Sequence, residues 1–132
     1  MNKTTLTVLI ILGAAFGLIF WGNRQAKNQS ENQDITQMCI QHQNLKMHIH
    51  QELKIIIKGE EQIIPANVGI VSAACYRPIH THDGSGTIHL EFPNVRDTRL
   101  AEFFLIWGKQ FNSNRIFDFQ NGPEGRVKML VN

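Results

Sequence analysis

The clearest alternation of apolar and polar positions runs from Cys75 to Phe92. Asp83–Gly86 has the composition of a tight turn, and its Gly-Ser centre suits a two-residue type II′ loop. With that loop, two arms form a hairpin in which His80 lies opposite His89. Successive side chains of a strand point to opposite faces. One face therefore holds Ile79, Ile88, Leu90 and Phe92, and the other holds His80, His82, His89 and Glu91.

A second segment with period two, His48–Lys58, predicts another strand. Gly59-Glu60 can turn the chain, and Gln62–Pro65 then returns as the partner strand. The apolar face of the first arm holds Ile49, Leu53, Ile55 and Ile57, and its polar face holds His48, His50, Glu52 and Lys54. The sequence thus predicts two hairpins, and each carries histidines on one face.

Helical spacing follows these hairpins. Apolar side chains recur at i, i+3, i+4 and i+7 in Arg99–Trp107, which predicts an amphipathic helix with Thr98 as its N-cap and Gly108 after its end. Arg115–Phe119 and Arg126–Val131 are further predicted strands. This order predicts an α+β fold with a mainly antiparallel sheet built of hairpins and one helix packed on it, for which a β-grasp-like arrangement fits. We expect a final strand to be missing, because the chain stops where the last strand enters a turn.

Residues 1–37 show a different pattern. Leu6–Trp21 is an almost unbroken apolar run, and with the two threonines before it a helix would span about 27 Å. Bulky residues stand where a signal peptidase requires small ones, so we predict a signal anchor, a transmembrane helix, over residues 1–21. A cleaved signal peptide and a buried core helix are the alternatives. Residues 22–37 are polar and predict a flexible stalk. The expected protein crosses the cell membrane once, with its domain, residues 38–132, outside the cytoplasm.

Charge narrows the choice of partners. The net charge is only +2, and no basic run occurs, so nucleic acid is not an expected partner. The membrane is an expected partner through the anchor, and an envelope protein is a further one. All six histidines lie between His42 and His89, which suggests that they share a role.

A metal site is the chemistry that this histidine pattern favours. A His-x-His pair on a strand places both imidazoles on one side, about 6.5–7 Å apart at the backbone, so that both can reach one ion. If the two hairpins lie side by side, one copper or zinc ion could take ligands from both. The predicted ligands are His48, His50, His80, His82 and His89, with Cys39, His42, Cys75, Asp83 and Glu91 as additional donors and Glu52 as a further carboxylate. The alternative is a solvated polar face.

Three interpretations of Cys39 and Cys75 are open. They could form a disulfide, which the chain-entropy account values at about 4 kcal/mol for such a loop. They could be thiolate ligands of the same metal, or two independent thiols. The sequence does not separate these alternatives.

Several motifs occur in an order that resembles a family of small, uncharacterised bacterial proteins with an N-terminal signal or anchor. The resemblance covers Cys39–Asn132 and rests on H-I-H at His48–His50, I-P-A-N-V-G-I at Ile64–Ile70, Cys75, H-T-H-D at His80–Asp83, G-T-I-H-L-E at Gly86–Glu91 and F-F-L-I-W-G at Phe103–Gly108. It implies no activity, but it implies a glycine turn and a closing strand beyond Asn132. This chain departs from the family at Asp97–Ala101, where relatives have F-T-L-G before the helix.

The leading functional hypothesis is a membrane-anchored extracytoplasmic domain that binds or handles a transition metal, copper before zinc. The second is a structural or protein-interaction module of the cell envelope, with a Cys39–Cys75 disulfide. A zinc hydrolase with Glu91 or Asp83 as base is a third. We predict no catalytic residues, because no nucleophile is paired with an oriented base, and the sequence favours a protein that is not an enzyme.

Overall fold

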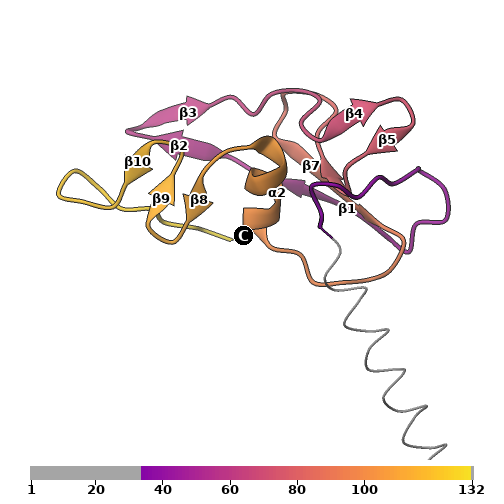
Figure 1. The fold of residues 1–132 in the computed structure, drawn as a ribbon. Coiled ribbons are helices and arrows are strands. Elements are labelled where there is room, and N and C mark those ends of the chain that lie inside the picture. The colour runs from indigo at the N-terminus through magenta and orange to yellow at the C-terminus, as the bar shows by residue number, and fades with distance from the viewer. Residues whose placement is uncertain (1–33, 132) are drawn as a thin grey trace, which may run out of the picture. The chain divides into compact units, whose positions relative to one another are not determined.

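A computed structural model describes residues 34–131, and residues 35–131 lie in one compact unit (Figure 1). Its strands are β1 (Met47–Glu52), β2 (Ile55–Ile57), β3 (Glu60–Gln62), β4 (Ile70–Ser72), β5 (Cys75–Tyr76), β6 (Ile79–His80), β7 (Thr87–Phe92), β8 (Phe111–Asn112), β9 (Arg115–Ile116) and β10 (Phe119–Gln120), and α2 spans Leu100–Trp107. All pairings between these strands are antiparallel. The predicted α+β class is confirmed. The strands form four small sheets, a finer division than the single curved sheet of a β-grasp-like arrangement.

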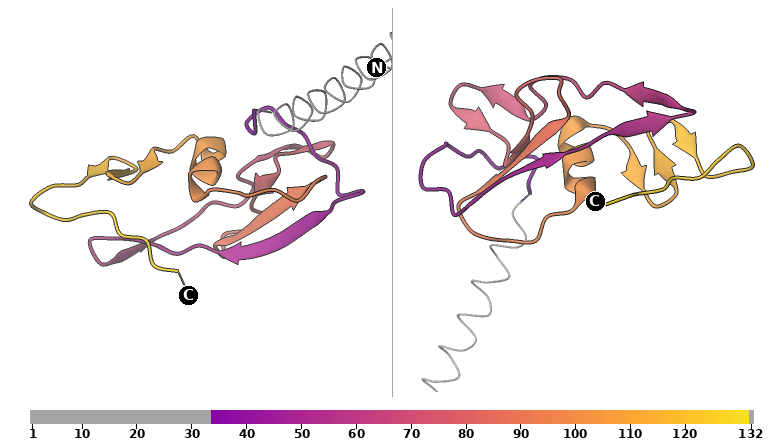
Figure 2. Two further views of the ribbon diagram at one scale, coloured as in Figure 1. Left: turned by 90° about the horizontal axis from the view of Figure 1, so that it is seen from below. Right: turned by 180° about the vertical axis from the view of Figure 1, so that it is seen from behind.

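The central sheet has the order β1-β7-β6 and positions the histidines. The predicted pairing of His80 with His89 is confirmed. The predicted two-residue type II′ loop is wrong, because β6 ends at His80, β7 begins only at Thr87, and Gly84 lacks the positive φ that such a turn requires. On its other side β7 pairs with β1, and there His50 lies opposite His89. Figures 1 and 2 show β1 and β7 side by side. The two histidine-bearing segments are therefore neighbours.

The helix α2 covers the apolar face of this sheet. Phe103 and Phe104 are each 1% exposed and belong to one core cluster with Ile79, Ile88 and Phe92. Figures 1 and 2 show α2 between the β4–β5 pair at one end and β8–β10 at the other. The apolar face of the predicted hairpin thus forms one side of the core, and α2 forms the other.

The ends of α2 differ partly from the prediction. The N-cap is Arg99, not Thr98, because the Arg99 backbone N–H donates to the Glu102 carboxylate at 2.9 Å and so anchors the first turn one residue later. At the other end Gly108 has φ of 70° and ends the helix, as predicted.

The predicted strand His48–Lys58 is interrupted, which was not expected. Leu53 donates its N–H to the Gly86 carbonyl at 2.9 Å, and β7 begins only after Gly86. At Gly86 the backbone has φ of +88°, and a Cβ there would lie 2.6 Å from the Leu53 carbonyl oxygen, so the close approach requires glycine. Beyond this point the chain leaves the central sheet and β2 pairs with β3 instead.

The turns and the C-terminal strands also differ from the prediction. Lys58 and Gly59 both have positive φ, which is the geometry of a type I′ turn, so the return strand is β3 and not Gln62–Pro65. Arg115–Phe119 is divided between β9 and β10, because a turn with Phe117 at φ of 51° separates them. Residues 126–131 form no regular element, and the strand predicted there is wrong.

The predicted anchor and most of the predicted stalk lie outside the described residues. Within residues 34–131, no helix has the length and apolar character needed to cross a membrane. Ile35, which the prediction assigned to the stalk, is 5% exposed and packs in the core.

Candidate metal centre

All six histidines converge on the face of the central sheet opposite α2. His50, His89 and His80 form a row across β1, β7 and β6, because each pairs with the next in register. Neighbouring rings in this row have centroids 4.3 Å and 5.3 Å apart. The other rings adjoin the row: His48 from β1, His82 from the loop after β6, and His42 from the segment before β1.

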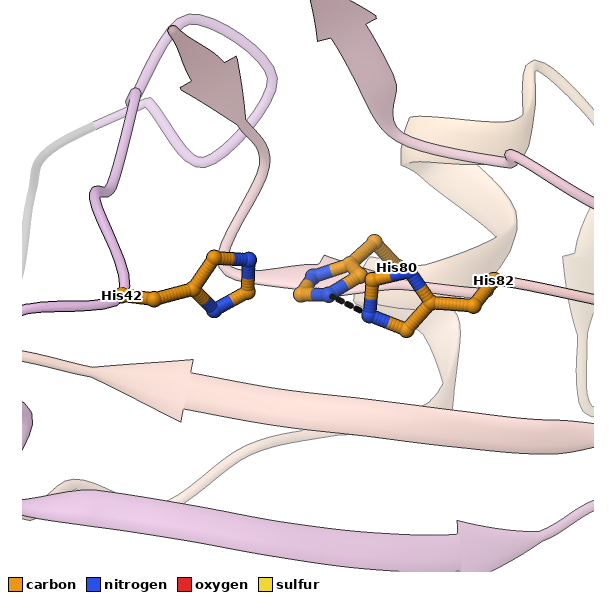
Figure 3. A group of neighbouring side chains, drawn as sticks. All are labelled: His42, His80 and His82. Atoms are coloured by element: carbon orange, nitrogen blue, oxygen red, sulfur yellow. Dashed lines mark hydrogen bonds between the residues drawn. The ribbon is translucent and has the colours of Figure 1, made fainter. Parts of the chain in front are cut away.

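Three sets of these side chains have the spacing of a metal site, with their ligand atoms all within 4.8 Å of one another. The sets are His42, His80 and His82; His48, His50 and His89; and His80, His89 and Glu91. These histidine clusters could hold a metal ion. Figure 3 shows the first set, in which the His42 ring points toward the His80–His82 pair.

Two pairs of imidazole nitrogens already have the separation of ligands on a common ion. The Nε2 atoms of His80 and His82 are 3.2 Å apart, and those of His48 and His50 are 3.0 Å apart; without an ion, each contact is a hydrogen bond between the two rings (Figure 3 shows the first). With metal–nitrogen bonds of about 2.0–2.1 Å, neighbouring ligand atoms lie about 2.9–3.4 Å apart for bond angles between a right angle and the tetrahedral one. Either pair could therefore take up an ion with little movement.

His80 lies fully buried beneath this cluster. Its Nδ1 lies 2.9 Å from the Arg77 carbonyl oxygen. A carbonyl can only accept, so Nδ1 carries the proton and the Nε2 lone pair of the neutral ring faces His82. Burial is the main cause that lowers the pKa of His80 to about 4, and the Arg77 hydrogen bond opposes this shift. At neutral pH the ring is thus an uncharged ligand whose orientation is fixed by its second nitrogen.

Thr81 fixes His80 and His82 on their face. Its side chain is fully buried on the opposite side, where the hydroxyl donates to the Pro65 carbonyl at 2.8 Å and accepts from the Val68 N–H at 3.1 Å. Because side chains alternate along an extended segment, anchoring Thr81 inward turns both histidines outward.

Glu91 is the acidic centre of the cluster and is 1% exposed. Its Oε2 lies 2.7 Å from Nδ1 of His42, and its Oε1 lies 3.2 Å from Nε2 of His48 and 3.7 Å from Nδ1 of His89. Even so, Oε2 of Glu91 and Nδ1 of His89 make no hydrogen bond of acceptable geometry within the described part of the chain. Burying a polar group without any partner costs about 1–3 kcal/mol, and the contact with His42 offsets part of this cost for Oε2 of Glu91. A bound cation would satisfy the carboxylate oxygen directly.

His89 lies between the two His-x-His pairs. Burial is the main cause that lowers its pKa, and the neighbouring His50 and His82 lower it further, while Glu91 raises it. His50, which lowers this pKa, also belongs to a set with His89, so a cationic His89 is disfavoured by a histidine that could share an ion with it. This environment favours the neutral form of the His89 imidazole, which has a lone pair available for an ion.

The segment that carries His42 is fixed by a disulfide between Cys39 and Cys75. The backbone of Ile40 also pairs with Tyr76, and the His42 ring packs edge-on against the Tyr76 ring, with centroids 4.6 Å apart. Of the three interpretations of the cysteines, the disulfide is confirmed. Because both sulfurs are bonded to each other, Cys39 and Cys75 are not thiolate ligands or free thiols, and those interpretations are wrong.

The other acidic donors named from the sequence lie outside the cluster. Asp83 is exposed and caps its own turn, where it accepts a hydrogen bond from the Ser85 N–H at 2.9 Å. Hydrogen bonds from Ser85 are the main cause that lowers the pKa of Asp83. Neither Asp83 nor the exposed Glu52 belongs to any of the three sets.

Two members of the site had little sequence signal. His42 follows no period, and it reaches the cluster through the disulfide and the Ile40–Tyr76 pairing beside it. Tyr76, whose ring contacts His42, His80 and His82, went unnoticed, although its position next to Cys75 could have indicated it.

The histidine cluster has an exposed rim, formed by four histidines, and a buried floor, formed by His80 and Glu91. His42, His48, His50 and His82 are exposed, whereas His80 and Glu91 are buried. A cavity of about 690 Å³ lies elsewhere, between β2, β10 and residues 124–130, and no histidine lines it. The chemistry of the described residues therefore gathers on an open face and not in that cavity.

Comparison of the chain with family models, with curated proteins and with solved structures finds no match in any of the three.

Proposed function

We propose that this protein binds a transition metal ion, copper in preference to zinc, on the histidine face of its central sheet, and that it handles or delivers this ion outside the cytoplasm. One observation carries the proposal. Six imidazoles from separate segments converge around a buried carboxylate, and two buried ligand atoms there make no hydrogen bond of acceptable geometry with the described residues. A solvated polar face would not bury Glu91 among histidines.

The ligand set favours copper. Imidazole suits zinc, copper, iron and nickel, and among divalent ions of the first row a nitrogen site binds copper most tightly. A disulfide in the same domain supports an oxidising compartment. The apolar run Leu6–Trp21 supports a membrane tether that holds the domain there.

Handling, as opposed to permanent storage, follows from the exposure of the rim. Four of the six histidines are exposed, so a partner can approach the ion directly. A structural metal site, in contrast, is typically closed by its protein ligands. We therefore propose exchange of the ion with an envelope protein or with a small chelator.

A copper titration of the full chain, kept in detergent, tests this proposal. We expect a dissociation constant below about 10 μM, which corresponds to about −7 kcal/mol. His50→Ala combined with His82→Ala removes two exposed rings and should weaken binding at least tenfold. Glu52→Gln changes an exposed carboxylate on the same strand, outside all three sets, and is the matched control. Weaker binding by the native chain, or equal binding by the double variant, would refute the proposal.

The disulfide keeps a second function under consideration. A domain stapled by Cys39–Cys75 with an exposed histidine rim could serve as a structural or interaction module of the envelope. In that case the same titration would find no tight copper binding, and the double variant would fold and unfold like the native chain.

A further inference from the structure

We propose that the histidine cluster holds two metal ions at once, one in each three-histidine set, with the Glu91 carboxylate between them. This inference rests on the proposed function and specifies its stoichiometry. It concerns the sets His42/His80/His82 and His48/His50/His89, named here the hairpin set and the edge set.

The two sets have no residue in common. The edge set comes from β1 and β7, and the hairpin set comes from β6, the loop after it and the segment fixed by the disulfide. Together they use all six histidines of the chain. Three imidazoles with an open position for a further ligand form a complete site for copper or zinc.

Each set also contains one pair of nitrogens already spaced as ligands of a single ion. The pair is His80–His82 in the hairpin set, at 3.2 Å, and His48–His50 in the edge set, at 3.0 Å. These short contacts lie within the sets, on opposite sides of Glu91. The geometry therefore offers two coordination centres.

Glu91 links the two sets through different oxygens. Its Oε2 faces His42 of the hairpin set at 2.7 Å, whereas its Oε1 faces His48 of the edge set at 3.2 Å. A carboxylate that bridges two ions places one of them at each oxygen. Its negative charge would offset part of the repulsion between two cations at the separation of about 3.5–4 Å that two-metal sites show.

The competing arrangement is one central ion on His80, His89 and Glu91. Such an ion would use only two of the six histidines. It would leave unexplained why the exposed rings of His42 and His48 turn toward the buried Glu91, since neither belongs to the central set. Two ions account for both contacts.

Native mass spectrometry of the full chain in detergent, titrated with Cu(II), distinguishes these arrangements. We expect two tightly bound ions per native chain. His42→Ala should reduce this number to one by disabling the hairpin set, and His48→Ala should reduce it to one by disabling the edge set. Both side chains are exposed, so both variants should fold. Glu52→Gln is the control and should retain two ions.

Electron paramagnetic resonance supplies a second readout on the same samples. Two Cu(II) ions bridged by Glu91 should couple magnetically, so the native chain should show less spin than its copper content. Each single variant should show the full signal of one isolated ion. One ion at saturation in the native chain, two ions that do not couple, or an unchanged count in both variants would overturn the inference. Absence of tight copper binding would instead overturn the proposed function.

Discussion

The two faces of the β1-β7-β6 sheet are built from the same strands but differ in what completes them. On one face Ile79, Ile88 and Phe92 are at most 3% exposed and pack into a core closed by the helix. On the other face the buried atoms Glu91 Oε2 and His89 Nδ1 make no hydrogen bond of acceptable geometry within residues 34–131, although Oε2 lies 2.7 Å from Nδ1 of His42. The apolar face is closed by packing alone, whereas the histidine face keeps ligand atoms whose hydrogen bonding is incomplete. This contrast predicts that substitutions on the two faces act on different measurements.

The largest expected effect comes from the helix that packs on the apolar face. Phe104→Ala removes a side chain that is 1% exposed and stacks on Phe111 with centroids 4.4 Å apart. We expect a loss of about 3–5 kcal/mol in the free energy of unfolding, because the cavity adds to the lost burial. Urea unfolding followed by tryptophan fluorescence measures it. Leu105→Ala, on the same helix but 59% exposed, is the control and should change stability little. Equal losses in both variants would contradict the assignment of the core.

The apolar face was also the easier one to predict. The glycine-rich turn and the period of two fix the pairing of His80 with His89 locally, and the i, i+3, i+4, i+7 spacing fixes the helix. Each of these signals lies within one short stretch of chain. The sequence therefore predicted the pairing of His80 with His89, the helix and the face on which the histidines of β6 and β7 lie, but not the six-residue connection between these strands.

The assembly of the histidine face depends on pairings that leave no local signal. The register of β1 with β7 joins segments about 40 residues apart, and period two alone does not choose a partner for β1. The position of His42 depends on the disulfide, which was one of three open alternatives. The burial of Glu91 follows only once both neighbours are in place. Five of the six histidines were proposed as ligands from the sequence and His42 as an additional donor, but the grouping of the six into sets was not predicted.

The next largest effect comes from removing the disulfide, which should change both the stability of the fold and the binding of copper. Cys39→Ser with Cys75→Ser opens a loop with a sequence separation of 36, and the chain-entropy account predicts a loss of about 4 kcal/mol. Because the disulfide fixes the segment of His42, we also expect copper binding by the hairpin set to weaken while the edge set keeps its ion. Urea unfolding measures the loss of stability. Native mass spectrometry on the fraction of the double variant that remains folded counts the bound ions. Loss of both ions from folded protein would show that the disulfide supports the whole cluster.

A smaller effect is expected from the buried carboxylate. Glu91→Gln keeps the shape of the side chain but removes its charge, and a neutral amide costs less to bury than a carboxylate with incomplete hydrogen bonding. We expect the metal-free protein to change by less than about 1 kcal/mol in either direction. Copper affinity should fall at least tenfold, because the bridging charge is lost. A strong loss of stability without copper would mean that Glu91 serves the fold and not the ions.

The last effect is confined to acid pH and concerns the metal-free protein. The pKa of His80 is lowered to about 4 in the folded state against an ordinary value of 6.5, mainly because the ring is buried. Between these values the unfolded chain binds a proton that the folded chain excludes, so protonation favours unfolding. Stability should thus be highest above pH 6.5 and decrease as the pH falls from 6.5 toward 4. The groups that face the ring are His42, His82, His89, Tyr76 and Glu91.

Urea unfolding at several pH values, with a chelator present, measures this dependence. His80→Gln is the informative comparison, because it removes the titrating ring and should flatten the part of the curve that His80 causes. A residual slope is expected from His89, whose pKa is lowered for similar reasons. If the variant kept the full slope, the acid sensitivity would arise from other groups. The assignment of His80 as a buried, neutral ring, which distinguishes this face from a solvated polar surface, would then be wrong.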